Sequence, residues 1–169
     1  MKILLAVEDF RCAETVRKAM IAQFKTDRTE VRLVHALEPF PVGLAEEMGG
    51  RGSPDFVAAR DRQRERLQKI FSEGSDALRS AGFHVTSSVG EGDARNVILD
   101  CAEEWGADLI VVCSHRQKGL KRFLLGSVAE AVARHAHCSV EIIRLPSEHQ
   151  PGGEVMGIYV GRCRANRMR

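Results

Sequence analysis

The chain has 169 residues, of which 44% are hydrophobic and 28% are charged, and its formal net charge is +2 at pH 7. This length is enough for one domain with a hydrophobic core and is short for two. The composition excludes a chain that is disordered throughout. The small net charge gives no general reason to expect a nucleic-acid partner.

Five cysteines occur singly, with no Cys-x-x-Cys pair and an odd total: Cys12, Cys101, Cys113, Cys138 and Cys163. This usage predicts no disulfide framework and indicates a reducing compartment. The apolar run at the N-terminus ends at Glu8, so it is too short for a signal peptide or a membrane span. We therefore expect a cytoplasmic protein without a membrane partner.

Five short runs rich in Val, Ile and Leu predict β-strands at Ile3–Val7, Val31–Leu37, Phe83–Val89, Leu109–Cys113 and Val140–Leu145. The first and fourth runs are almost continuously apolar, which is typical of parallel strands covered on both faces. Four stretches between the runs carry apolar residues at helical spacing, and their stripes begin at Val16, Leu67, Val97 and Val128. This alternation predicts an α/β fold, an open five-stranded parallel sheet flanked by helices on both faces.

Two segments fall outside the alternation. Glu38–Asp55 contains three prolines and four glycines, and a connection of this length is expected to be a lid, a binding loop or a disordered segment. We assign residues 1–145 to the domain and residues 146–169 to a C-terminal extension. The apolar run Val155–Val160 in the extension is either a docked strand or part of a poorly ordered tail.

The segment Cys113–Leu125 follows the fourth predicted strand and precedes a helix that opens with Gly126 and Ser127. In an open parallel sheet, ligands bind beyond the carboxyl ends of the strands. Gly126 allows backbone N–H groups to approach an anion, and Ser127 can cap the helix or donate its hydroxyl to a phosphate. The segment also carries four cations and no acidic residue. It predicts a phosphate site, with a solvated basic loop before a capped helix as the alternative.

Two other motifs are better explained by structure. Gly90–Asp93 lacks the third glycine of a dinucleotide fingerprint, and it predicts a strand end followed by an Asp93 cap on a helix beginning at Ala94. His135 and His137 are two positions apart and cannot share one face of a helix. They therefore indicate a helix terminus rather than a metal site.

Cys113 lies beside Ser114 and His115 in the cationic segment, where a thiol can become reactive. It also ends a buried strand, where cysteine behaves as a small apolar residue, and no resolving cysteine is near it in sequence. A structural thiol is therefore favoured over a redox thiol. Adjacent Ser114 and His115 do not form a nucleophile elbow, and we predict no catalytic residue.

Four stretches resemble the universal stress protein family: Lys2–Glu8, Ala107–Val112, Ser114–Ala129 and Cys138–Arg144. The similarity spans residues 2–145 and leaves out the extension. The resemblance implies a Rossmann-like fold of the adenine-nucleotide α-hydrolase type and a stress-response module without a reaction of its own. It also implies a homodimer formed through the last strand, Val140–Leu145, and a protein partner that the sequence does not identify.

Nucleotide-binding members of that family carry Gly, two residues, Gly, nine residues, and then Gly followed by Ser or Thr. The spacing is kept here at Cys113, Arg116, Gly126 and Ser127, but the first two glycines are absent. Glu8 stands where those members have aspartate, and Ala36 stands where the backbone meets adenine. The site implied by the resemblance comprises Ala6, Val7, Glu8, Ala36, Val112, Cys113, His115, Arg116, Gly126, Ser127 and Val128.

The two replaced glycines have opposing consequences. Arg116 loses the φ > 0 conformations that glycine allows, at a strain of about 1–2 kcal/mol, yet its guanidinium can bind phosphate through two hydrogen bonds. One hypothesis is therefore a module that binds ATP or another adenine nucleotide, with Mg²⁺ held only through the nucleotide. A nucleotide-free dimer that acts by protein interaction and a slow ATPase are the alternatives, and an interaction role for the basic tail is a further one.

Overall fold

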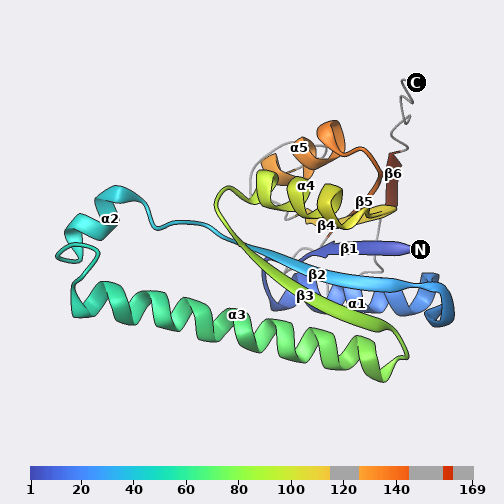
Figure 1. Cartoon of the computed structure of the whole chain (residues 1–169), viewed down its shortest axis with the longest axis horizontal. Coiled ribbons are helices and arrows are strands. Elements are labelled where there is room, and N and C mark those ends of the chain that lie inside the picture. The colour runs from blue at the N-terminus through green and yellow to red at the C-terminus, as the bar shows by residue number, and fades with distance from the viewer. Residues whose placement is uncertain (115–125, 145–157, 162–169) are drawn as a thin grey trace.

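The computed structural model describes residues 1–114, 126–144 and 158–161 (Figure 1). In these ranges one sheet has the strand order β3-β2-β1-β4-β5-β6. The strands are β1 (Lys2–Ala6), β2 (Glu30–Leu37), β3 (His84–Glu91), β4 (Leu109–Ser114), β5 (Ser139–Arg144) and β6 (Ile158–Gly161). Strands β1 to β5 are parallel, which confirms the predicted five-stranded sheet. Strand β6 pairs antiparallel with β5 and forms the sheet edge.

Helices lie on both faces of the sheet (Figure 1). They are α1 (Phe10–Gln23), α2 (Val42–Glu47), α3 (Pro54–Ser80), α4 (Ala94–Trp105) and α5 (Ser127–His135), with a 3₁₀ turn, η1, at Thr26–Arg28. Helices α1 and α3 pack on one face, and α4 and α5 pack on the other. No helix in the described residues is long and apolar enough to cross a membrane.

Successive side chains of β1 point to opposite faces and enter two separate apolar layers. Ile3 and Leu5 pack in the layer formed with α1 and α3, whereas Leu4 and Ala6 pack in the layer formed with α4 and α5. Ile3, Leu4 and Leu5 are fully buried. The continuously apolar run at the N-terminus is therefore the central strand of the sheet, as both-face burial requires.

The connection Glu38–Asp55 is more ordered than the predicted loop. It contains α2, and Ser53 caps α3 by accepting a hydrogen bond from the Phe56 N–H at 3.2 Å, with Pro54 as the first helical residue. Helix α3 then runs for 27 residues, or about 40 Å at 1.5 Å per residue. Its N-terminal end and α2 extend beyond the strands (Figure 1).

The turn before α4 has the predicted structure. The Asp93 carboxylate caps α4 by accepting from the N–H groups of Arg95 at 3.0 Å and Asn96 at 3.4 Å. Its hydrogen bonds to the Arg95 guanidinium lower the pKa of Asp93 to about 2. A Cβ built at Gly90 would collide with the Val97 side chain, so glycine at this position permits close packing of strand and helix.

The histidine pair also lies where it was predicted, at the end of α5. His135 is the last residue of the helix, and His137 follows the C-cap residue Ala136. In the part of the chain that the structure describes, no group of three or more His, Cys, Asp or Glu is placed to hold a metal ion.

Glu141 is a buried carboxylate in β5, with only 4% of its surface exposed. The Gln23 side chain, at the end of α1, donates a hydrogen bond to Glu141 Oε1 at 3.4 Å. Burial raises the pKa of Glu141, and the hydrogen bond from Gln23 opposes this only in part. The folded chain therefore binds this proton more tightly than the unfolded chain does.

Because of that difference, the free energy of unfolding falls as pH rises from the ordinary glutamate pKa through the raised one. Glu141→Gln keeps an acceptor for Gln23 and removes the buried charge. We expect its Tm at pH 7–8 to exceed that of the parent by about 2–4 °C, which corresponds to ~1 kcal/mol for a chain of this size, and the difference to disappear near pH 4.

Thermal unfolding followed by circular dichroism between pH 4 and pH 8 measures this effect. Glu103→Gln, at an exposed position of α4, is the matched control and should leave Tm within about 1 °C of the parent. A Glu141→Gln variant that is less stable than the parent at pH 7 would contradict the prediction.

Candidate functional site

A cavity of about 280 Å³ opens at the carboxyl ends of β1, β2 and β4. Strand β1 pairs with β2 on one side and with β4 on the other, so the order of strands reverses at this point. In open parallel sheets, ligands bind in the crevice outside the strand ends at such a reversal. The cavity is therefore where the topology places a ligand.

Seven of the eleven predicted site residues line this cavity: Ala6, Val7, Glu8, Ala36, Val112, Cys113 and Val128. Gly126 and Ser127 are at the start of α5 and are not among the lining residues. His115 and Arg116 lie outside the described residues. The structure thus brings together the strand-end residues and the first turn of α5.

The cavity also contains residues that were not predicted: Cys12, Val34, His35, Glu38, Gln63, Ala94 and Ile98. Val34, Ile98 and Val112 are buried and give it an apolar wall, whereas Glu8 and Glu38 are exposed at its rim. An apolar pocket with a few polar groups is typical of small-molecule sites. Gln63 belongs to the N-terminal half of α3, where no local sequence signal distinguishes it from its polar neighbours.

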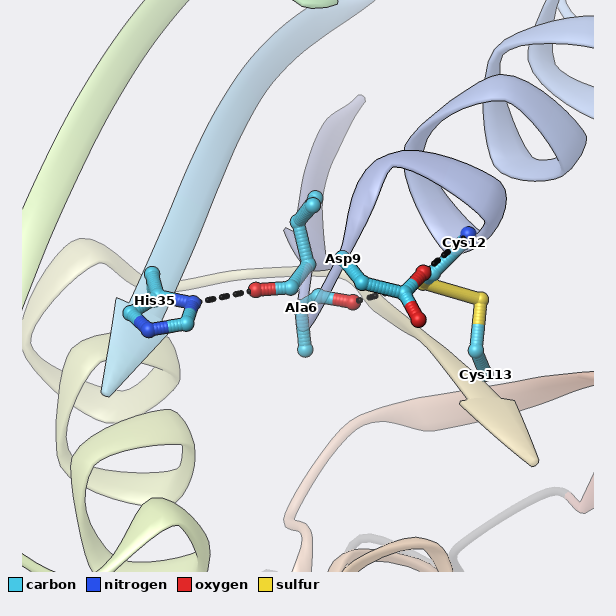
Figure 2. The surroundings of a disulfide bond; sticks show 6 residues. Ala6, Asp9, Cys12, His35 and Cys113 are labelled. Atoms are coloured by element: carbon cyan, nitrogen blue, oxygen red, sulfur yellow. Dashed lines mark hydrogen bonds between the residues drawn. A yellow bond between two sulfur atoms is a disulfide. The ribbon is translucent and has the colours of Figure 1, made fainter. Parts of the chain in front are cut away.

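His35 is held in place at the cavity by the end of β1. Its Nδ1 lies 2.6 Å from the Val7 carbonyl oxygen (Figure 2). Because a carbonyl oxygen only accepts, Nδ1 carries the hydrogen, and in the neutral ring Nε2 is left as an acceptor. The edge of the ring also meets Phe71 of α3, with 6.4 Å between centroids. His35 therefore connects β2, β1 and α3 at one wall of the cavity.

The start of α5 differs in detail from the prediction. Gly126, not Ser127, is the N-cap, and exposed Ser127 is the first helical residue. The Gly126 N–H donates to Ser114 Oγ at 3.4 Å. The Gly126 φ of −60° suits any residue, and a Cβ built there would meet no described atom within 4 Å. The surrounding chain does not require glycine here, but close approach of an anion to the helix N-terminus would.

Cys12 and Cys113 form a disulfide, with 5.9 Å between their Cα atoms (Figure 2). The single cysteines, which predicted no disulfide framework, did not reveal this pair, and Cys113 has a partner although no cysteine is near it in sequence. The two residues are 101 positions apart, but β1 and β4 are neighbours, so the first turn of α1 lies beside the end of β4. Among the described residues, Cys101 and Cys138 are not part of a disulfide, and Cys163 lies outside those residues.

An open, mostly parallel sheet with a crevice at its switch point defines a Rossmann-like α/β protein. The sequence profile of the universal stress protein family matches residues 1–144, so the chain belongs to that family. Universal stress protein MJ0531 of Methanocaldococcus jannaschii is 30% identical over 155 residues, covering 87% of this chain and 84% of the relative. Universal stress protein A homolog 2 of Coxiella burnetii is 31% identical, covering 85% and 92%.

Solved structures share the fold at lower identity. Hypothetical protein MJ0577 has a TM-score of 0.70 and 24% identity, covering 87% of this chain and 97% of its own. A universal stress family protein of Arabidopsis thaliana with AMP bound has a TM-score of 0.64 and 18% identity, covering 90% and 96%. The universal stress protein of Archaeoglobus fulgidus in complex with dAMP has a TM-score of 0.56 and 23% identity, covering 84% and 96%.

Proposed function

We propose that the chain is a cytoplasmic, non-enzymatic stress-response module that binds an adenine nucleotide, ATP with Mg²⁺ being the form tested first. The observation that carries the proposal is the cavity at the strand ends, which seven of the predicted site residues line. Structural neighbours that hold AMP and dAMP support the choice of adenine as the base.

The residues present fit such a ligand. The apolar wall formed by Val34, Ile98 and Val112 suits a purine ring, and Glu8 at the rim carries oxygens that can accept from ribose hydroxyls. The N-terminus of α5 at Gly126 and Ser127 offers backbone N–H groups and the positive end of a helix dipole to phosphates. Mg²⁺ enters the proposal as the counterion of the phosphate oxygens.

A second cavity, of about 370 Å³, shares lining residues with the first and is bordered by the segment that contains α2. Phe40, Arg51 and Phe56 line it, and it shares Glu38 and Gln63 with the first cavity. A ligand that moves either shared residue also changes the surroundings of the segment containing α2. We propose that nucleotide binding is signalled through this segment to a protein partner.

Filling the base-binding end of the cavity should abolish binding. Ala36→Leu adds three carbons at a lining position, and we expect it to raise the Kd for ATP with Mg²⁺ at least tenfold, because the base and the leucine cannot occupy the same space. Ala58→Leu adds the same atoms at an exposed position of α3 and should leave the Kd unchanged.

Isothermal titration calorimetry on protein stripped of ligand by unfolding and refolding makes this measurement. Equal affinities of the parent and Ala36→Leu for ATP would show that the nucleotide does not bind in this cavity. If neither the parent nor any variant binds ATP at millimolar concentration, the hypothesis that remains is a nucleotide-free module that acts by protein interaction.

The phosphates are tested separately at the start of α5. Gly126→Ala fits the described chain, but its methyl group would stand beside the N–H groups that phosphates approach. We expect affinity for ATP to fall about fivefold and affinity for adenosine to stay the same. Gly43→Ala in α2, where a Cβ also meets nothing within 4 Å, is the matched control. A parallel loss of ATP and adenosine would contradict a phosphate contact at Gly126.

We also propose that the chain forms a homodimer along the sheet edge where β5 and β6 lie. Val140–Ile143 of β5 pair with β6, so the two copies would meet through β6 unless it is displaced. Light scattering coupled to size exclusion should show a dimer for the full chain. A monomeric full chain whose 146–169 deletion dimerises would show that β6 blocks the edge. Monomers in both cases would overturn the proposed dimer.

A further inference from the structure

The disulfide Cys12–Cys113 lies in the wall of the candidate nucleotide cavity, and both residues line that cavity. We propose that this pair is a reversible thiol–disulfide switch, oxidised by hydroperoxides, and that its oxidation state sets the affinity of the cavity for nucleotide. The affinity half of this inference rests on the proposed nucleotide binding, whereas the modification half rests on the position of the two cysteines and on the proposed cytoplasmic location.

The two cysteines occupy unlike and complementary positions. Cys12 is fully buried in the first turn of α1, where its N–H donates to the capping Asp9 carboxylate at 2.8 Å. Cys113 is half-buried at the end of β4 and is the more accessible of the two. Their Cα separation of 5.9 Å lies in the range that a disulfide bridges without movement of the backbone.

The pairing is selective within the described chain. Cys101 and Cys138 are partly exposed yet form no disulfide in the described residues, and the pair that forms is the one bordering the cavity. In a cytoplasmic protein, a disulfide is usually transient and either catalytic or redox-sensing, because glutathione and thioredoxin keep thiols reduced. The cytoplasmic location that we propose therefore favours a reversible bond over a permanent structural one.

The oxidation balances with a hydroperoxide as the two-electron oxidant. The Cys113 thiolate attacks the peroxide oxygen and the O–O bond breaks, so that Cys113 becomes a sulfenic acid and the leaving oxygen takes a proton to form water or an alcohol. The Cys12 sulfur then attacks the Cys113 sulfur, the S–S bond forms and water leaves. Two thiols and one hydroperoxide thus give one disulfide, and a dithiol reverses the change by thiol–disulfide exchange.

Reduction changes the space inside the cavity. Bonded sulfurs lie about 2.05 Å apart, whereas unbonded ones need roughly 3.5 Å or more. Cys12 is enclosed in the layer between α1 and the sheet, and its Sγ lies 3.6 Å from the Ala6 carbonyl oxygen, to which a free thiol donates. Cys113 therefore takes most of the displacement, on the side where it borders the cavity.

A displacement of Cys113 also affects the N-terminus of α5, where we propose that the phosphates bind. Ser114 follows it directly, and Ser114 Oγ accepts the hydrogen bond from the Gly126 N–H. When Cys113 moves, the acceptor at the N-cap of α5 moves with it. In the reduced chain, the displaced Cys113 narrows the cavity and the acceptor at the N-cap of α5 is shifted. We therefore expect the oxidised chain to bind nucleotide more tightly than the reduced chain.

The test uses the full chain, first reduced with dithiothreitol and freed of it, and then treated with hydrogen peroxide. Labelling with N-ethylmaleimide after each sample is unfolded in guanidinium, which exposes the buried Cys12, followed by peptide mass spectrometry, should show loss of label at Cys12 and Cys113 after peroxide, and its return after renewed reduction. Calorimetry with ATP and Mg²⁺ should give a Kd at least fivefold higher for the reduced chain than for the oxidised one.

Single substitutions separate the pair from the other cysteines. Cys12→Ser and Cys113→Ala should each abolish the redox response, so that the Kd of either variant for ATP is the same after dithiothreitol and after hydrogen peroxide. Cys101→Ser is the matched control and should keep the full response. Circular dichroism of each variant shows whether it is folded, and Cys113→Ala carries the test if Cys12→Ser does not fold.

The possible results are distinguishable. Label retained at both cysteines after peroxide overturns the modification. Reversible loss of label with equal Kd values in the two states overturns the control of affinity and leaves the proposed function intact. Absence of ATP binding in every state overturns the proposed function and the control of affinity together, and the labelling still decides whether the cysteines are modified.

Discussion

Strand β1 pairs with β2 along one side and with β4 along the other, and the arrangement of the molecule depends on this double pairing. It places the strand in the middle of the sheet, where Ile3, Leu4 and Leu5 are fully buried between the two helical layers. The helices that follow β1 and β4, α1 and α5, pack on opposite faces of the sheet, so that a cavity remains between the ends of these two strands. The apolar core and the candidate site therefore have one origin.

The same pairing explains why Cys12 meets Cys113. Helix α1 begins immediately beyond β1, capped by Asp9, and Cys113 lies near the end of β4. Cys12, in the first turn of α1, is thus near the point where the chain leaves β4. Cys12 and Cys113 both line the cavity, so a covalent bond between them can change the shape of the space that a ligand would occupy.

Features set by local chemistry were predictable from the sequence, and features set by distant contacts were not. The apolar runs located the five parallel strands to within a residue or two, and Asp93 was identified as a cap because an aspartate before a helix satisfies its free N–H groups. The Cys12–Cys113 bond and the place of Gln63 in the cavity depend on which strands are neighbours. No single segment of the sequence indicates the order of the strands, so neither the disulfide nor the position of Gln63 could be predicted.

The order found in Glu38–Asp55 has a similar cause. Its prolines and glycines indicated an irregular connection, but Pro54 is well suited to the first position of a helix, and Ser53 supplies the cap. Hydrophobic periodicity does not indicate which separate segments form one site. The resemblance to universal stress proteins supplied this information, because it assigned Glu8, Ala36 and Val128 to the same site. The structure places these three at one cavity.

The length of α3 gives the molecule the properties of a lever. Leu67, Ile70 and Leu78 hold its C-terminal part against the core, while Pro54 begins its overhanging end. Gln63, at the cavity, is about 6 Å along the axis from Leu67, and Pro54 is about 20 Å from it. A tilt about Leu67 that shifts Gln63 by a given amount would shift the α2 end roughly three times as far. A small displacement at the cavity would thus be largest at the part of the molecule farthest from the sheet.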